Sequence, residues 1–166
     1  TFAQIDSTQE KAAEFRQNYE DPAGHVIQAM TMSEGRGRRG RTWHAPMGNL
    51  YLSIIVNPDI HPKDCGQLAF LSAMSVVELV LTLMGPDTDV EVKWPNDVLV
   101  KNKKLSGILI EKQGQYYIIG VGINVMAAPE EAIGLQDLSD KRLPIHPLRD
   151  LFLDIFNAYY TRWQNE

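Results

Sequence analysis

The spacing of apolar and polar residues divides the chain into helical and extended segments. Residues 68–83 and 146–163 place apolar side chains at helical spacing, and Ser7-Thr8-Gln9-Glu10 forms a capping box that predicts a helix start. Strands are predicted where apolar and β-branched residues run between turn signals. The predicted helices are 8–18, 68–83 and 146–163, and the predicted strands are 25–31, 49–56, 90–93, 98–100, 105–111 and 116–125.

Short connections join the last four predicted strands, which indicates an antiparallel meander. Residues 127–144 mix Pro, Gly and charged residues, and they predict no more than a short helix near Glu130 or Leu138. No repeat, low-complexity tract or linker divides the sequence. A length of 166 residues suits one domain, so residues 1–166 are expected to form a single domain in which helices pack on a sheet.

Composition and charge narrow the class of protein. Hydrophobic residues make up 44% and charged residues 22% of the chain, which is typical of a folded globular domain. A net charge of −5 argues against a general nucleic-acid binder. The single cysteine, Cys65, suits a reducing compartment, so a cytoplasmic location is expected. No signal-peptide pattern is present, and polar residues within 68–84 predict a buried helix and no membrane span.

One short segment departs from the acidic balance. Residues 35–43 (GRGRRGRTW) hold four of the sixteen Lys and Arg residues within six positions, interleaved with glycines. Glycine lets backbone N–H groups approach a ligand that a Cβ would keep away. Taken alone, the segment has three interpretations: a phosphate cradle, an RNA-contacting arginine patch, or a solvated surface turn.

A second cluster, Lys93-Trp94-Pro95-Asn96-Asp97, lies between two predicted strands. Its amide and carboxylate oxygens could hold a nucleotide or a hydrated Mg²⁺, although Pro-Asn-Asp is also ordinary turn chemistry. Lys104 opens an apolar strand, where it would serve as a fixed cation for a carboxylate or phosphate, or else extend to solvent. Gly107, in mid-strand, indicates either close approach of a ligand or a bulge.

Other common site types are not supported by the sequence. Residues 120–125 (GVGINV) contain two glycines but lack the third glycine and the helix of a dinucleotide fingerprint. The four histidines have no spacing typical of zinc ligation, so no metal ligands are assigned. No nucleophile-base arrangement stands out, and covalent catalysis by the protein is not expected.

Taken together, five motifs in this order resemble the catalytic domain of biotin protein ligases: GRGRRGRTW, P-x-G-N-L-Y-L-S, KWPNDVLV, KKLSGILIE and GVGIN. The resemblance extends from Asp6 to Trp163. It implies an α+β fold with a mixed, largely antiparallel sheet packed by helices, related to class II aminoacyl-tRNA synthetases. It also implies that biotin and MgATP form biotinyl-5′-AMP, from which biotin passes to a lysine of a biotin carboxyl carrier protein.

The resemblance assigns roles to residues of this chain. Arg38 and Lys104 would be catalytic, because cations must screen a carboxylate and a phosphate that repel each other. The expected biotin contacts are Ser7, Thr8, Gln9, Met32, Gly35, Arg36, Gly37, Lys104 and Gly107. The expected ATP or adenylate contacts are Arg36, Arg38, Arg41, Trp43, Lys93, Asn96, Asp97 and Asn124.

Two positions depart from the family pattern. Gln9 stands where Asn usually follows Ser-Thr, and Met32 stands three residues before the loop, where Gln usually offers hydrogen bonds inside the ligand pocket. Biotin affinity is therefore expected to be reduced, or another group to take over. The sequence shows no helix-turn-helix segment before Asp6 and ends near the start of the family's C-terminal β-barrel, so transcriptional repression is not expected and activity without the barrel is left open.

Three alternatives stay open at this point. A lipoate or octanoate ligase shares the fold, but that family usually has a glycine-rich loop with fewer arginines. Met32 and the missing C-terminal domain also allow a non-catalytic module that binds biotin or adenylate. Nucleic-acid binding by the arginine loop is the third alternative, and the net charge of −5 disfavours it. The oligomeric state is also left open, and a homodimer is one possible state. Like charges and glycines predict that the loop is disordered until adenylate binds.

Overall fold

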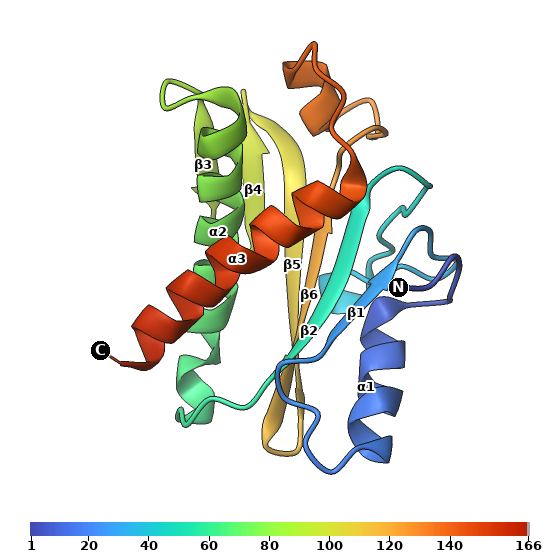
Figure 1. The fold of residues 1–166 in the computed structure, drawn as a ribbon, viewed down its shortest axis with the longest axis vertical. Helices are drawn as coiled ribbons and strands as arrows, with labels where there is room; N and C mark the ends of the chain where they lie inside the picture. Colours follow the sequence, from blue (N-terminus) through green and yellow to red (C-terminus); the bar gives the residue numbers. More distant parts are fainter. Residues whose placement is uncertain (166) are drawn as a thin grey trace.

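A computed structural model describes residues 1–165, which form one six-stranded sheet and three α-helices (Figure 1). The helices are α1 (Thr8–Asn18), α2 (Gly66–Met84) and α3 (Ile145–Gln164), with short 3-10 turns at η1 (Arg38–Gly40), η2 (Pro62–Cys65) and η3 (Leu135–Leu138). The strands are β1 (Val26–Ala29), β2 (Leu50–Val56), β3 (Val90–Lys93), β4 (Asp97–Val100), β5 (Lys103–Gln113) and β6 (Tyr116–Ile123).

The strand order in the sheet is β1-β2-β6-β5-β4-β3, and every pair of named strands is antiparallel. Strands β3 to β6 form the predicted meander, while β2 and β6 lie side by side in the middle although they are far apart in sequence. Parallel pairing occurs in isolated bridges such as Ile5 with Met32. The predicted α+β fold with a largely antiparallel sheet is therefore confirmed.

The two faces of the sheet are covered differently (Figure 1). Helices α2 and α3 pack on one face, where the alternate β2 residues Leu50, Leu52 and Ile54 enter the main hydrophobic core. Helix α1 lies against the other face and buries a smaller cluster that includes Ile55. Because successive strand residues point to opposite faces, Tyr51 and Ser53 lie on the α1 side. That side is where the candidate site forms.

The predicted element boundaries match the structure to within two residues. The predicted helix 8–18 is α1 at both ends. The predicted strand 25–31 ends at Ala29, because the Thr31 hydroxyl and the Met32 N–H both donate to the Ala45 carbonyl (2.8 and 3.2 Å) and draw the chain off the sheet. The short helix expected near Glu130 or Leu138 is η3, at Leu138.

Helix α2 is the apolar segment that the sequence analysis assigns to the core. Residues Lys63–Met84 are long and apolar enough to cross a membrane by length and composition, but half of this stretch is buried inside the protein. Leu68, Leu79 and Val80 are fully buried in the main core. The packing is that of a core helix.

Asn49 holds the chain that follows β6. Its Oδ1 accepts from the backbone N–H groups of Val125, Met126 and Ala127 (2.8, 3.0 and 3.1 Å), and its Nδ2 donates to the Ala127 carbonyl at 2.7 Å. The side chain is buried. Because the loss of these bonds leaves buried N–H groups without a partner, we expect Asn49→Ala to lower the free energy of unfolding by about 2–4 kcal/mol in a urea titration.

The matched control is Asn18→Ala on α1, whose exposed amide donates to the Glu14 carbonyl. We expect it to change the unfolding free energy by less than about 0.5 kcal/mol. Equal effects at Asn49 and Asn18 would contradict the assigned role of Asn49.

Candidate active site

A cavity of about 610 Å³ opens on the α1 side of the sheet. Two rows of residues, paired across β2, β6 and β5, lie beneath it: an outer row, Tyr51–Gly122–Gly107, and an inner row, Ser53–Gly120–Leu109, and all of them except Ser53 line the cavity. Three of these six positions are glycine, so little side-chain volume fills the space above the sheet. The alternation of β6, which places both its glycines on one face, therefore produces the hollow.

The indole of Trp43 lies on the outer row of this floor. A Cβ at Gly107 would lie 2.8 Å from Cζ3 of Trp43, and a Cβ at Gly122 would lie 2.7 Å from Cε2. A Cβ at Gly35 would clash with the backbone carbonyl oxygen of Trp43. Trp43 Nε1 is buried without a hydrogen-bond partner among the described residues. The glycines thus admit a flat ring against the sheet.

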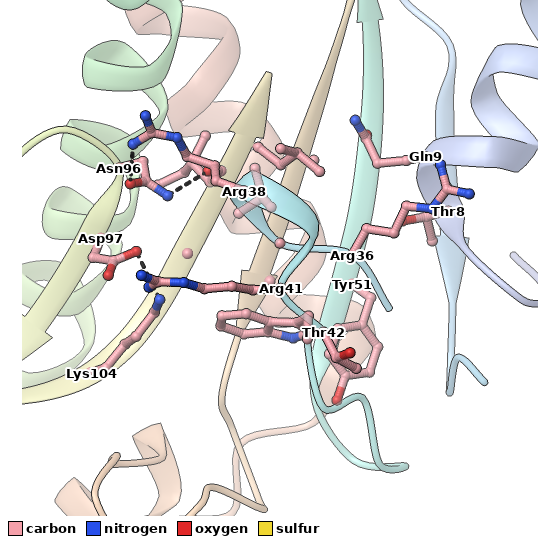
Figure 2. Close-up of a pocket in the computed structure, with 18 of the residues that line it drawn as sticks. Thr8, Gln9, Arg36, Arg38, Arg41, Thr42, Tyr51, Asn96, Asp97 and Lys104 are labelled. Atoms are coloured by element: carbon pink, nitrogen blue, oxygen red, sulfur yellow. Dashed lines mark hydrogen bonds and ion pairs between the residues drawn. The ribbon is translucent and has the colours of Figure 1, made fainter. Parts of the chain in front are cut away.

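The inner end of the cavity is lined by uncharged polar side chains, with Arg36 beside them (Figure 2). Ser7, Thr8 and Gln9 line it from the start of α1, and all three are buried. Ser7 caps the helix by accepting from the Gln9 N–H at 3.2 Å, and the Met32 sulfur accepts from the Thr8 N–H at 3.3 Å. The Ser53 hydroxyl lies 2.9 Å from Thr8 Oγ1 and 2.8 Å from Gln9 Oε1.

The outer end is cationic (Figure 2). Arg38 donates to Asn96 Oδ1 at 2.8 Å, and the Asn96 amide in turn donates to the Ile108 carbonyl at 2.9 Å. Lys104 Nζ lies 2.8 Å from Asp97 Oδ1 and 5.3 Å from the centre of the Trp43 ring. Six cationic side chains line the cavity: Arg36, Arg38, Arg39, Arg41, Lys93 and Lys104.

The glycine-arginine loop forms a short hairpin over the cavity. Gly37 N–H donates to the Arg41 carbonyl at 2.7 Å, and Trp43 N–H donates to the Gly35 carbonyl at 2.8 Å. Arg36 forms an ion pair with Glu10 of α1. The sequence predicts that Glu10 closes the capping box at the start of α1. In the structure the Glu10 carboxylate pairs with the loop instead. That this loop is disordered until adenylate binds stays a prediction.

Most of the residues predicted for the site meet in this one cavity. It is lined by the predicted residues Ser7, Thr8, Gln9, Met32, Arg36, Gly37, Arg38, Arg41, Trp43, Lys93, Asn96, Asp97, Lys104 and Gly107. Gly35 and Asn124 lie outside its lining. Asn124 is buried, and its amide donates to the Lys104 carbonyl at 3.3 Å, which places it behind Lys104. Contact of either residue with a ligand stays a prediction.

Three further residues of this region were not predicted as site residues. Tyr51 lines the cavity, the Ser53 hydroxyl forms a hydrogen bond with Gln9 at its inner end, and Glu111 accepts a hydrogen bond from the Gln9 amide at 2.9 Å. A sequence signal exists for Tyr51 and Ser53, because they are the polar positions of an otherwise apolar strand and share one face. Glu111 is the last residue of the KKLSGILIE motif, but its contact with Gln9 depends on the tertiary fold.

Tyr51 serves the site as a neutral hydrogen-bond donor. Its hydroxyl donates to the Pro46 carbonyl at 2.8 Å, which holds the chain that follows Trp43. Burial raises the pKa of Tyr51 to about 12. The phenol consequently keeps its proton at neutral pH.

Among residues 1–165, no three His, Cys, Asp or Glu side chains gather as a metal-binding group. Asp97 is the one carboxylate in the lining of the cavity. Mg²⁺ at nucleotide sites commonly uses one or two carboxylates together with phosphate oxygens and water. Asp97 therefore fits a Mg²⁺ that arrives with a nucleotide.

The contact of Trp43 with the sheet floor can be tested with Gly122→Ala. The added methyl would lie within 3 Å of the indole, so the ring must shift or the core must strain. We expect a loss of about 1–3 kcal/mol of unfolding free energy. We also expect more acrylamide quenching of Trp43 fluorescence, measured with Trp94 and Trp163 replaced by phenylalanine.

Gly66→Ala is the control, because a Cβ at Gly66 meets no atom within 4 Å. It should leave the quenching of Trp43 unchanged. A Gly122→Ala protein with unaltered quenching and stability would refute the close stacking.

Several known proteins are similar to this chain in sequence and fold. A model of the biotin/lipoate A/B protein ligase family matches residues 1–124. The bifunctional ligase/repressor BirA of Bacillus subtilis (strain 168) is 40% identical over 133 residues, which are 76% of this chain and 40% of that protein. The biotin--[acetyl-CoA-carboxylase] ligase of Paracoccus denitrificans is 31% identical over 173 residues, covering 98% of this chain and 71% of that protein.

The solved structure of the Aquifex aeolicus biotin protein ligase, in complex with biotin and ATP, matches with a TM-score of 0.87 at 29% identity. The match covers 100% of this chain and 72% of that one. This chain spans well under half of the length of the Bacillus relative. The family match covers well over half of the chain, and the Paracoccus match extends along nearly all of it, so the chain belongs to the biotin/lipoate A/B protein ligase family.

Proposed function

We propose that this chain carries out the ATP-dependent attachment of biotin to a lysine of a biotin carboxyl carrier protein, by way of biotinyl-5′-AMP. The observation that carries the proposal is the division of one cavity into an end lined by the polar side chains of α1 and an end where Arg38, Arg41 and Lys104 gather, separated by the glycine floor under Trp43. A ligand with a polar ring and a carboxylate fits this order. The carboxylate would then lie where the phosphates of ATP are also attracted.

The first step joins two anions. A carboxylate oxygen of biotin attacks the α-phosphorus of ATP, and the bond to pyrophosphate breaks. Lys104 and Arg38 project into the cationic end, where they would screen the carboxylate and the α-phosphate and hold them in line. Asn96 positions Arg38 through the 2.8 Å bond, and Asp97 positions Lys104 in the same way.

The nucleotide would lie under the loop. Trp43 offers its ring, and Arg36, Arg41 and Lys93 add positive charge around the phosphates. Asp97 is the residue that would hold Mg²⁺, whose charge would further screen the phosphates when it is bound. In the second step the carrier lysine attacks the acyl carbon, and AMP leaves as the amine loses a proton.

Biotin is favoured over lipoate as the substrate. The family description covers both acids, but the relatives in Paracoccus denitrificans and Aquifex aeolicus are named as biotin ligases. The Aquifex aeolicus structure contains biotin and ATP. A single domain, a cytoplasmic location, a homodimer and the lack of nucleic-acid binding remain predictions.

The test is biotin-dependent exchange of labelled pyrophosphate into ATP. We expect exchange with biotin, ATP and Mg²⁺, none without biotin, and much less with lipoate in place of biotin. Folded protein that shows no exchange but binds biotin in calorimetry would support a non-catalytic module instead. Exchange that is faster with lipoate would assign the chain to the other branch of the family.

A further inference from the structure

The inner end of the cavity contains a buried amide whose orientation is fixed by its surroundings. The carboxamide of Gln9 lies against the backbone of Gly120, where a Cβ would be 2.9 Å from Oε1. Gln9 is only 4% exposed. Its side chain lines the cavity, so the two ends of its amide decide which groups the inner wall offers to a ligand.

The hydrogen bonds of this amide can be counted. Nε2 donates to Glu111 Oε2 at 2.9 Å and to the Ile118 carbonyl at 3.5 Å, which uses both of its hydrogens. Oε1 accepts from the Ser53 hydroxyl at 2.8 Å and keeps a second lone pair. Because an ionised carboxylate only accepts, Glu111 selects the NH₂ end of Gln9 and turns the carbonyl end toward Ser53.

The side chain of Met32 cannot supply a hydrogen-bonding group equivalent to an amide. A thioether is at best a weak acceptor, and the Met32 sulfur already accepts from the Thr8 N–H. The amide that is missing at position 32 is therefore available from Gln9, whose side chain is one methylene longer than the Asn usual at that position. Gln9 reaches across the floor to Gly120, far enough to bond with β5 and β6.

We propose that Gln9 determines which acyl ring this chain accepts and that Glu111 is the residue that positions it; this inference rests on the proposed function. Gln9 Oε1 accepts a hydrogen bond from a ring N–H of a cyclic urea, as in biotin. A dithiolane, as in lipoate, has no N–H and would leave this buried acceptor with its second lone pair unused. A site that hydrogen-bonds its substrate rejects analogues that lack the group.

The test compares Glu111→Leu with Glu111→Gln. Leucine removes the acceptor for Gln9 Nε2, whereas glutamine keeps one. We expect Glu111→Leu to raise the Kd for biotin in calorimetry and the KM for biotin in the exchange reaction by about tenfold, with kcat changed little. Glu111→Gln should stay within about twofold of the wild type. Lipoate, as a competitor of biotin, should bind both variants as it binds the wild type.

A second variant, Gln9→Met, keeps the length of the side chain and removes the acceptor directly. It should weaken biotin binding at least as much as Glu111→Leu and leave the affinity for lipoate unchanged. The inference is overturned if the biotin Kd is unaltered in Glu111→Leu, if Glu111→Gln fails equally, or if biotin and lipoate weaken together. If the wild type shows biotin-dependent exchange but the variants bind biotin as the wild type does, this inference alone is refuted. If the wild type does not bind biotin at all, the proposed function is refuted as well.

Discussion

Lys104→Met is expected to slow biotin-dependent pyrophosphate exchange about 10²–10³-fold, the effect typical of removing one preorganised charge from a reacting centre. Lys104 Nζ is held by Asp97 at 2.8 Å, at the cationic end of the cavity and near the Trp43 ring. Methionine keeps an unbranched apolar stem of similar length but carries no charge. Without the ammonium, the carboxylate and the α-phosphate would approach with less screening.

Lys103→Met is the matched control, because Lys103 is the preceding residue on β5, is exposed, and lies outside the cavity lining. Its exchange rate should stay within about twofold of the wild type. Lys104 is partly exposed, so the loss of its ion pair with Asp97 should lower the unfolding free energy by no more than about 1 kcal/mol. A large loss of stability, or equal losses of activity at both lysines, would contradict a role in catalysis.

The order of secondary-structure elements could be predicted because each has its own local signal. The apolar and β-branched run of β2, the capping residue Ser7 and the helical spacing of α3 each depend on neighbours in sequence. The ends of strands were less predictable. β1 stops at Ala29 because Thr31 and Met32 bond to Ala45, a contact between segments that no local pattern encodes.

The same distinction applies to the site. The motif residues Arg38, Asn96 and Lys104 meet in one cavity, as the order of motifs predicts. Glu111 closes the KKLSGILIE motif, but its role could not be assigned from the motif, because its bond to Gln9 joins positions 102 residues apart in sequence. Asn124 belongs to a recognised motif but lies behind the backbone of Lys104. A motif therefore indicates that a residue is near the site and leaves open whether its side chain reaches the ligand.

The second large effect is expected at the loop. Arg38→Ala should slow biotin-dependent pyrophosphate exchange by about 10²-fold or more, because it removes a guanidinium that Asn96 aims at the cationic end of the cavity. Arg38→Lys should recover only part of the rate, since an ammonium lacks the planar fork that binds two oxygens of a phosphate or carboxylate. The measurement is the exchange rate at saturating biotin and ATP, so that kcat is compared.

Arg39→Ala provides the control within the same loop. Arg39 is exposed, has φ of 57°, and makes no hydrogen bond or ion pair with another of the described residues. Removing it subtracts the same charge from the loop without removing an oriented donor. If the loop acts only through its total charge, Arg38→Ala and Arg39→Ala will slow exchange equally and added salt will reduce both effects. If the orientation set by Asn96 matters, Arg38→Ala alone will be severely impaired, and Asn96→Ala will reproduce part of its loss.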